Sequence, residues 1–231
     1  MSARVTRSLW LCVASLIAFN VARGLGVFGS FADWVELVLA LILTFVALRS
    51  DLSLADIGLE RQRLRAGAIW GGAAFAVVLL VVFAAGVIPA TSGFLHDERA
   101  EVSFGALLVD VVIGIGLLTV IPEELLFRGV LLGASTKQWG VRTGVVFSSA
   151  LFGLWHVFPT LSTAGGNEQF AQAETSTLGR LGLVGGAVVA TALAGAVFSW
   201  LRLRSGSLLA PMIGHLSTNG VALAVAWVVV H

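Results

Sequence analysis

Charged residues are scarce in this chain of 231 residues, where Asp, Glu, Lys and Arg together make up 12%. Soluble globular domains carry about 25% charged residues, whereas 58% of this chain is hydrophobic and its mean hydropathy is +0.97. This composition excludes an ordinary water-soluble domain and indicates a protein whose surface faces the lipid bilayer. The formal net charge is only +1, so the sequence gives no electrostatic reason to expect binding to nucleic acid.

Cysteine and tyrosine are also rare. Tyrosine is absent, and the single cysteine, Cys12, lies in an apolar run and cannot form an internal disulfide. That first apolar run has no small-x-small cleavage site and is followed by six more apolar segments, so we interpret it as an uncleaved span rather than a signal peptide. No linker, repeat or low-complexity tract divides the chain, and one domain over residues 1–231 is expected.

A sliding window of about 20 residues predicts an all-α fold, a polytopic bundle of about seven transmembrane helices. The predicted spans are residues 8–28, 34–49, 67–90, 104–127, 143–161, 181–201 and 207–230. If the amino terminus is cytoplasmic, eleven of the fourteen Lys and Arg residues lie on the cytoplasmic side and three outside. This asymmetry satisfies the positive-inside rule. We therefore predict that the amino terminus is cytoplasmic and that the protein lies in a bacterial or archaeal cytoplasmic membrane.

Two further features predict how the spans are arranged. Small residues recur at four-residue spacing in the sixth span, from Gly182 and Gly186 to Ala190 and Ala194, which predicts close helix packing along that face. The connection 50–67 alternates apolar with charged residues, so we expect it to lie along the membrane surface.

Three apolar segments each contain polar side chains that are costly in lipid. They are Glu123 and Glu124 in the fourth span, His156 in the fifth, and His215 with Asn219 in the seventh. An ionisable side chain in the middle of a membrane costs about 2.5–3.5 kcal/mol on insertion scales. A cost repeated on three separate spans favours convergence of these side chains into one buried reaction centre.

The fourth span contains both an ion pair and an unpaired acid. Glu124 and Arg128 are four residues apart on a helix, with the acid on the amino-terminal side, which is the better orientation for a pair. Glu123 lies about 100° around the helix from Glu124, so Arg128 need not neutralise it. An unpaired buried carboxylate is suited to act as a general base. The alternative is a helix end with solvated charges at the cytoplasmic interface.

The two histidines lie too deep to reach water. Helical rise places His156 about 20 Å and His215 about 12 Å from the predicted cytoplasmic end. Asn219 follows His215 by four residues and is expected on the same face. The alternative for each is a structural hydrogen bond between helices. Asp110, alone near the outer end of its span, is expected to be structural.

These residues form three ordered motifs that resemble those of the CAAX-protease and bacteriocin-processing (Abi) family of intramembrane proteases, which includes the type II CAAX prenyl endopeptidases. The motifs are Glu123-Glu124-x-x-x-Arg128, Phe152-x-x-x-His156 and His215-x-x-x-Asn219. The resemblance covers about residues 103–225, including the GSLLAPMIGH sequence that leads into the third motif. The one departure is a long polar stretch between the second and third motifs.

The resemblance implies an intramembrane endopeptidase that hydrolyses membrane-associated or prenylated-type substrates. By motif position, Glu123 would be the general base that activates water, and His156 would orient that water. His215 and Asn219 would donate hydrogen bonds to the oxyanion of the tetrahedral intermediate. The implied partners are a peptide or protein substrate at the membrane and the lipid bilayer.

The sequence leaves two alternatives for the role of a metal. We favour a cofactor-free mechanism in which Glu124 and Arg128 support the first carboxylate. The alternative is a zinc-dependent metalloprotease in which Glu123, His156 and His215 hold Zn²⁺ and a fourth position stays open.

A non-enzymatic transporter or peptide-binding scaffold is a further alternative. We expect the active-site cavity to open toward the cytoplasm and to be closed from outside by the loop 162–180.

Overall fold

The computed structural model of the chain describes residues 3–50, 52–88, 98–163 and 175–231. Within these ranges every regular element is helical and there is no β-strand, so the predicted all-α fold is confirmed. Seven helical segments are long and apolar enough to cross a membrane. They are Val5–Gly24, Gly29–Leu48, Leu54–Val87, Phe104–Trp139, Val141–Ser162, Thr177–Ser205 and Leu209–Val230.

Several of these segments are built from consecutive shorter helices. The first half of the chain contains α1 (Ala3–Gly24), η1 (Gly29–Phe31), α2 (Ala32–Leu48), α3 (Leu54–Ile57), η2 (Arg61–Arg63), α4 (Leu64–Val87) and η4 (Glu98–Ala100). The fourth segment consists of α6 (Phe104–Val109), η5 (Asp110–Val120), α7 (Ile121–Glu123), η6 (Glu124–Leu131) and α8 (Leu132–Trp139). The remainder comprises α9 (Val141–Trp155), α10 (Val157–Thr163), α12 (Thr177–Ser205), α13 (Leu209–Leu216), η8 (Ser217–Val221) and α14 (Ala222–Val230).

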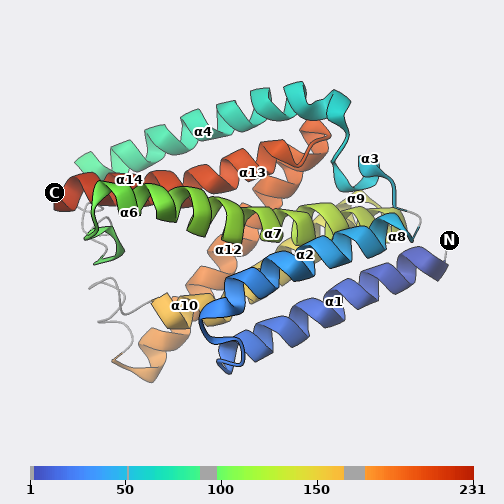
Figure 1. The fold of residues 1–231 in the computed structure, drawn as a ribbon, viewed down its shortest axis with the longest axis horizontal. Helices are drawn as coiled ribbons and strands as arrows, with labels where there is room; N and C mark the ends of the chain where they lie inside the picture. The colour runs from blue at the N-terminus through green and yellow to red at the C-terminus, as the bar shows by residue number, and fades with distance from the viewer. Residues whose placement is uncertain (1–2, 51, 89–97, 164–174) are drawn as a thin grey trace.

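The fourth segment runs through the middle of the bundle (Figure 1). The helix α2 packs against its parts η5, α7 and η6, the helix α13 packs against η5, and α9 packs against α8. All eight residues of η6 are buried, and the main hydrophobic core collects around them from α1, α2 and α9. This segment extends to Trp139, beyond the predicted end at residue 127. Other parts of the protein surround the polar residues near the predicted end of this segment, so these residues do not end the helix.

The connection between the second and third spans packs in part against the rest of the protein, and its predicted position along the membrane surface stays a prediction. It begins with a capping box, in which the Ser53 hydroxyl accepts from the Asp56 amide and the Asp56 carboxylate accepts from the Ser53 amide. The side chain of Ile57 is buried, and Arg202 donates to the carbonyl oxygens of Ala55 and Asp56 at 2.8 and 3.0 Å. The connection therefore covers the end of the helix bundle.

The predicted small-residue interface in the sixth span is wrong at Gly182, Gly186 and Ala190, which are exposed, whereas Ala194 packs against the cluster of Phe198, Leu201 and Ala210. Nothing lies within 4 Å of the position that a Cβ would take at Gly182 or Gly186, so this part of α12 is open. The close approach between α12 and α9 lies on another face, where a Cβ added to Gly153 would be 2.5 Å from the Val188 carbonyl oxygen and 2.9 Å from the Ala192 Cβ. Small residues permit close packing, but their spacing alone does not indicate which face the neighbouring helix approaches.

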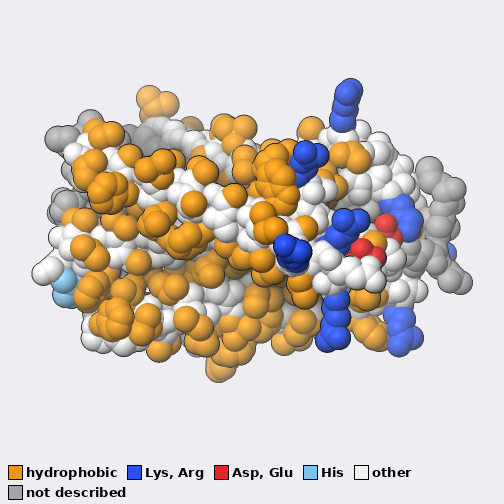
Figure 2. Space-filling view, turned by 90° about the horizontal axis from the view of Figure 1, so that it is seen from above, with side chains coloured by type: hydrophobic (Ala, Val, Ile, Leu, Met, Phe, Trp, Pro, Cys, Tyr) orange, Lys and Arg blue, Asp and Glu red, His pale blue; other side chains and the backbone are white. Residues whose placement is uncertain are grey.

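The charged surface is unevenly distributed, as the orientation rule requires. Figure 2 shows Lys and Arg side chains gathered toward one end of the molecule, whereas hydrophobic side chains cover most of the rest of the face in view. The amino and carboxyl ends lie at opposite ends of the bundle (Figure 1), as expected for seven spans. The cytoplasmic position of the amino terminus stays a prediction.

That orientation can be tested by thiol labelling in sealed, right-side-out membranes. Gln62 in η2 and Ser30 in η1 are both exposed and lie on opposite sides of the predicted membrane. In a Cys12→Ser background, we expect Ser30→Cys to react with a membrane-impermeant maleimide added outside. Gln62→Cys should react only after the membranes are permeabilised. The reverse pattern would place the amino terminus outside.

Candidate active site

The centre of the site is a buried charge network between η6 and α13. The Nη1 of Arg128 donates to Oε1 of Glu124 at 3.0 Å, and Nδ1 of His215 lies 2.9 Å from the same oxygen. The exposed fractions are 0% for Glu124, 1% for Arg128 and 4% for His215. The four-residue spacing predicted the Glu124–Arg128 pair correctly, although η6 is a π-helix rather than an α-helix. The network joins two of the three sequence motifs.

Aromatic rings enclose the Arg128 guanidinium. Its Cζ lies 3.8 Å from the centroid of the Phe152 ring and 5.1 Å from that of Phe198. A Cβ added to Gly195 would lie 3.3 Å from Nη2 of Arg128, so the absence of a side chain there leaves room for the guanidinium. Cation–π contacts of this kind are worth about 2 kcal/mol or more when desolvated, and they help to stabilise a cation that has one carboxylate partner.

Glu123 stands apart from that ion pair, as the sequence predicted. Its Oε1 accepts a hydrogen bond from Nε1 of Trp155 at 2.9 Å. Its Oε2 is buried and has no hydrogen-bond partner among the described residues, and it lies 3.8 Å from Nε2 of His215. One carboxylate oxygen is therefore fixed by an indole, while the other is free to accept a proton.

His215 links the two glutamates. Its Nδ1 is engaged by Glu124, which directs Nε2 toward Glu123. The ring stacks on Phe198, with centroids 5.1 Å apart and planes 25° apart. A carboxylate that bonds one imidazole nitrogen fixes the ring orientation and leaves the other nitrogen for chemistry. In His215 this other nitrogen is Nε2, and it faces Oε2 of Glu123.

The ring of Phe152 lies between His156 and this network. His156 follows the last residue of α9, and its Nδ1 donates to the Phe152 carbonyl oxygen at 2.8 Å. Its Nε2 has no hydrogen bond to the described residues. Its ring lies 4.6 Å from that of Phe152, which in turn lies 5.9 Å from the ring of His215. The two histidines therefore both contact Phe152, and none of the hydrogen bonds found in the described parts of the chain joins His156 to Glu123.

Asn219 lies one turn beyond His215 but outside the network. It is exposed, and its Oδ1 accepts from the Thr218 hydroxyl at 3.4 Å. The turn from Ser217 to Val221 is π-helical. A π turn takes one more residue than an α turn, so the four-residue rule for α-helices does not fix the direction of the Asn219 side chain. Its predicted role as an oxyanion donor stays a prediction.

Sequence reasoning missed three kinds of residue in and around the site. Trp155 was not assigned a role, because a tryptophan in an apolar run gives no sign of a polar partner. The second motif includes Phe152, but the sequence gives its ring no role, and Phe198 lies in none of the motifs. Glu36 was not singled out, although it is a lone acid in the second span. The insertion cost that identified Glu123 applies equally to Glu36, and this signal could have found it.

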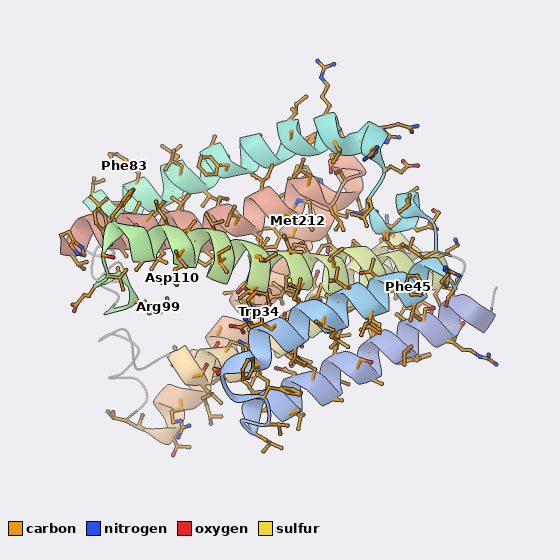
Figure 3. The ribbon with its side chains drawn as sticks, viewed as in Figure 1. Trp34, Phe45, Phe83, Arg99, Asp110 and Met212 are labelled. Carbon is orange, nitrogen blue, oxygen red and sulfur yellow. The ribbon has the colours of Figure 1, made fainter. Side chains whose placement is uncertain are left out.

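Asp110 lies outside the charge network, and its expected structural role stays a prediction. It begins η5 and is exposed, and it lies at the same end of the bundle as Arg99 of η4 (Figure 3).

The alternative zinc site requires Glu123, His156 and His215 to converge. Among the residues that the structure describes, no three His, Cys, Asp or Glu side chains gather closely enough to hold a metal ion. Glu123 and His215 approach each other, but His156 has Nδ1 bonded to the Phe152 carbonyl. In this conformation the donor set does not fit a three-ligand zinc site, and we derive no step through a metal.

A cavity of about 580 Å³ lies at the turn between α1 and α2, where α10 packs beside them. Its lining includes Arg23, Asp33 and Phe158. By the predicted orientation this cavity lies on the outer side of the membrane. None of the motif residues lines it, so the predicted opening of the active site toward the cytoplasm stays a prediction. Most of the loop 162–180 that was expected to close the outer side, residues 164–174, lies outside the described residues.

The comparison with known families identifies one family whose members resemble this chain. The sequence model of the type II CAAX prenyl endopeptidase Rce1-like family matches residues 104–221, just over half of the chain. The match begins with α6 and ends with η8, and it contains all three motifs. No curated protein and no solved structure matches the chain. The chain belongs to the type II CAAX prenyl endopeptidase Rce1-like family, a family of membrane proteases.

Proposed function

We propose that this protein is an intramembrane endopeptidase that hydrolyses membrane-associated or prenylated-type substrates with Glu123 as the general base. One observation carries the proposal: the unpartnered Oε2 of Glu123 faces Nε2 of His215 at 3.8 Å inside a buried site. A gap of this length is too long for a direct hydrogen bond. It suits two groups that act on one water molecule or on one substrate oxygen.

In the proposed reaction, the free oxygen of Glu123 takes a proton from water as that water attacks the scissile carbonyl carbon. His156 presents a free Nε2 and would orient the water. The proton on Glu123 then passes to the leaving amine, which completes the hydrolysis. General acid–base catalysis of this kind contributes about 10²- to 10⁴-fold to a rate.

The negative charge that develops on the substrate oxygen requires hydrogen-bond donors to stabilise it. His215 is held by Glu124, and a proton on its Nε2 would donate to that oxygen. Asn219 is the second proposed donor and would have to turn toward His215 when substrate binds. Arg128 stabilises the charge of Glu124. Together, Glu124 and Arg128 position the imidazole rather than the substrate.

The proposal is tested by hydrolysis of fluorogenic membrane-peptide substrates by the purified protein in detergent. We expect cleavage that saturates with substrate and is lost in Glu123→Gln. The substrates would include a peptide with a prenylated cysteine and the same peptide without the lipid. Binding of both peptides without cleavage would contradict the proposal and favour a peptide-binding scaffold.

Water activation by a carboxylate predicts that activity does not depend on a metal. After exhaustive chelation, the protein should keep its full rate of peptide cleavage, and elemental analysis should find well under one zinc per chain. A matched sample with added zinc is the control for inhibition by the chelator itself. Loss of activity on chelation, restored by stoichiometric zinc, would instead require the Glu123–His156–His215 site.

A further inference from the structure

Two neighbouring residues of the first helix contact the tryptophan that holds Glu123. Phe19 and Asn20 lie on α1, outside residues 104–221, which match the family model. Phe19 is only 5% exposed, and Asn20 is a lone amide in an apolar stretch. A polar side chain in a transmembrane helix typically hydrogen-bonds to a neighbouring helix. Neither residue has a role in the mechanism described above.

Asn20 holds the backbone of Trp155. Its Nδ2 donates to the Trp155 carbonyl oxygen at 3.3 Å. In a continuous α-helix that carbonyl would accept from the amide four residues further on, but that residue is Pro159, which has no N–H. An unpaired carbonyl is costly at membrane depth. The Asn20 amide therefore replaces the missing backbone donor and fixes the end of α9 against α1.

Phe19 holds the ring of the same tryptophan. The rings of Phe19 and Trp155 are stacked, with centroids 5.7 Å apart and planes 16° apart. Phe28 stacks on Phe19 in turn, at 5.2 Å. Phe127 contacts the indole with its edge, at 5.5 Å and 69°. Stacked and edge-to-face pairs are the favourable aromatic geometries, and Trp155 is only 4% exposed, so these contacts restrict the rotation of the indole.

The direction of the indole decides where the carboxylate of Glu123 lies. Nε1 of Trp155 donates to Oε1 of Glu123 at 2.9 Å, and Oε2 has no hydrogen-bond partner among the described residues. A hydrogen bond is directional and weakens steeply when its angle falls. A rotated indole would therefore either release the carboxylate or draw it away from Nε2 of His215, which lies 3.8 Å from Oε2.

We propose that Phe19 and Asn20 are positioning residues, which hold Trp155 so that its indole orients the carboxylate of Glu123 toward His215. The inference rests on the proposed function in its use of Glu123 as the base, but the hydrogen bond of the indole can be measured without any cleavage. An oriented base matters because a displacement of about 1 Å can cost about 100-fold in rate. The active site therefore extends to α1, beyond the segment that matches the family model.

The first readout is the indole N–H resonance of Trp155 in protein labelled with ¹⁵N-tryptophan, assigned by its loss in Trp155→Phe. Phe19→Leu removes the stacked ring, and Asn20→Leu removes the donor to the carbonyl. We expect both to move the resonance to higher field, because the N–H loses its bond to a carboxylate. Leu9→Ala is the control, since Leu9 is also buried in α1 but lies about 15 Å from Phe19 along the helix. It should lower Tm and leave the resonance in place.

The second readout is cleavage. Phe19→Leu and Asn20→Leu should each lower kcat about 10- to 100-fold, with KM within twofold of the wild-type value. Trp155→Phe keeps an aromatic ring but has no N–H to donate, and should lower kcat about 100-fold. In that background Phe19→Leu should lower kcat less than about twofold further, because residues that act through one contact are not additive. Losses that multiply would show that Phe19 supports the fold and does not act through the indole.

An unchanged Trp155 resonance in both α1 variants would overturn the positioning role, whatever happens to cleavage. A shifted resonance with unchanged kcat would overturn it as well, since the orientation of the indole would then not matter to the reaction. If Phe19→Leu does not fold, Asn20→Leu decides the question alone, because leucine is favourable in a transmembrane helix. Failure of the wild-type protein to cleave any substrate would contradict the proposed function alone, and the resonance would still decide whether α1 holds the indole on Glu123.

Discussion

Glu123→Gln should lower kcat/KM for peptide cleavage by about 10²- to 10⁴-fold, the usual contribution of a general base, and leave stability nearly unchanged. The amide oxygen of glutamine can still accept from Nε1 of Trp155, the one hydrogen bond that fixes this side chain. The other carboxylate oxygen has no partner among the described residues. Its replacement therefore removes the proton acceptor but breaks no contact that supports the fold.

The measurement pairs initial rates with a thermal melt in the same detergent. A change in Tm of less than about 3 °C would correspond to at most about 1 kcal/mol for a chain of this length. Asp110→Asn is a matched control, because it neutralises an exposed acid in the same helical segment. Cleavage by Glu123→Gln at the rate of the Asp110 variant would remove Glu123 from the mechanism.

The spans and the first motif could be predicted because they depend on local sequence. Mean hydropathy over about 20 residues identifies a transmembrane helix, and the described part of the chain contains seven such segments. The Glu124–Arg128 pair follows from spacing along one helix, so it did not require knowledge of the neighbours. The isolation of Glu123 from Arg128 followed from the same geometry.

What sequence reasoning did not predict depends on how the helices are rotated against one another. Gly182 and Gly186 form a regular stripe, yet α9 packs on a different face of α12. Asn219 follows His215 at an α-helical spacing, but the turn that contains Asn219 is π-helical, so this spacing does not fix the direction of its side chain. Spacing along one helix does not indicate which neighbouring helix packs against a given face of it.

Glu124→Gln should destabilise the protein strongly, in contrast to Glu123→Gln. The Oε1 of Glu124 accepts from Arg128 at 3.0 Å and lies 2.9 Å from Nδ1 of His215. The amide can still accept a hydrogen bond, but it carries no charge to balance the buried guanidinium. Breaking a buried pair in this way costs about 3–5 kcal/mol. We expect a fall in Tm of about 6–20 °C and a loss of cleavage, because His215 loses its orienting partner.

The control for an ordinary ion pair is Lys137→Gln, which breaks the Lys137–Asp56 contact of 2.9 Å between side chains that are 43% and 30% exposed. An exposed pair contributes about 0–1 kcal/mol, so its Tm should hardly change. A fall in Tm for Glu124→Gln no larger than for Lys137→Gln would show that the buried charge is not what stabilises the site.

A second replacement separates stability from activity at the same position. Glu124→Gln/Arg128→Met removes the guanidinium as well as the carboxylate, and the methionine can pack between Phe152 and Phe198, where the guanidinium lay. Replacing both members of a buried pair is often nearly neutral, so Tm should recover most of the loss. Cleavage should stay lost, because no charged acceptor holds Nδ1 of His215. Recovered cleavage in the double variant would show that Glu124 serves the fold and has no part in orienting His215.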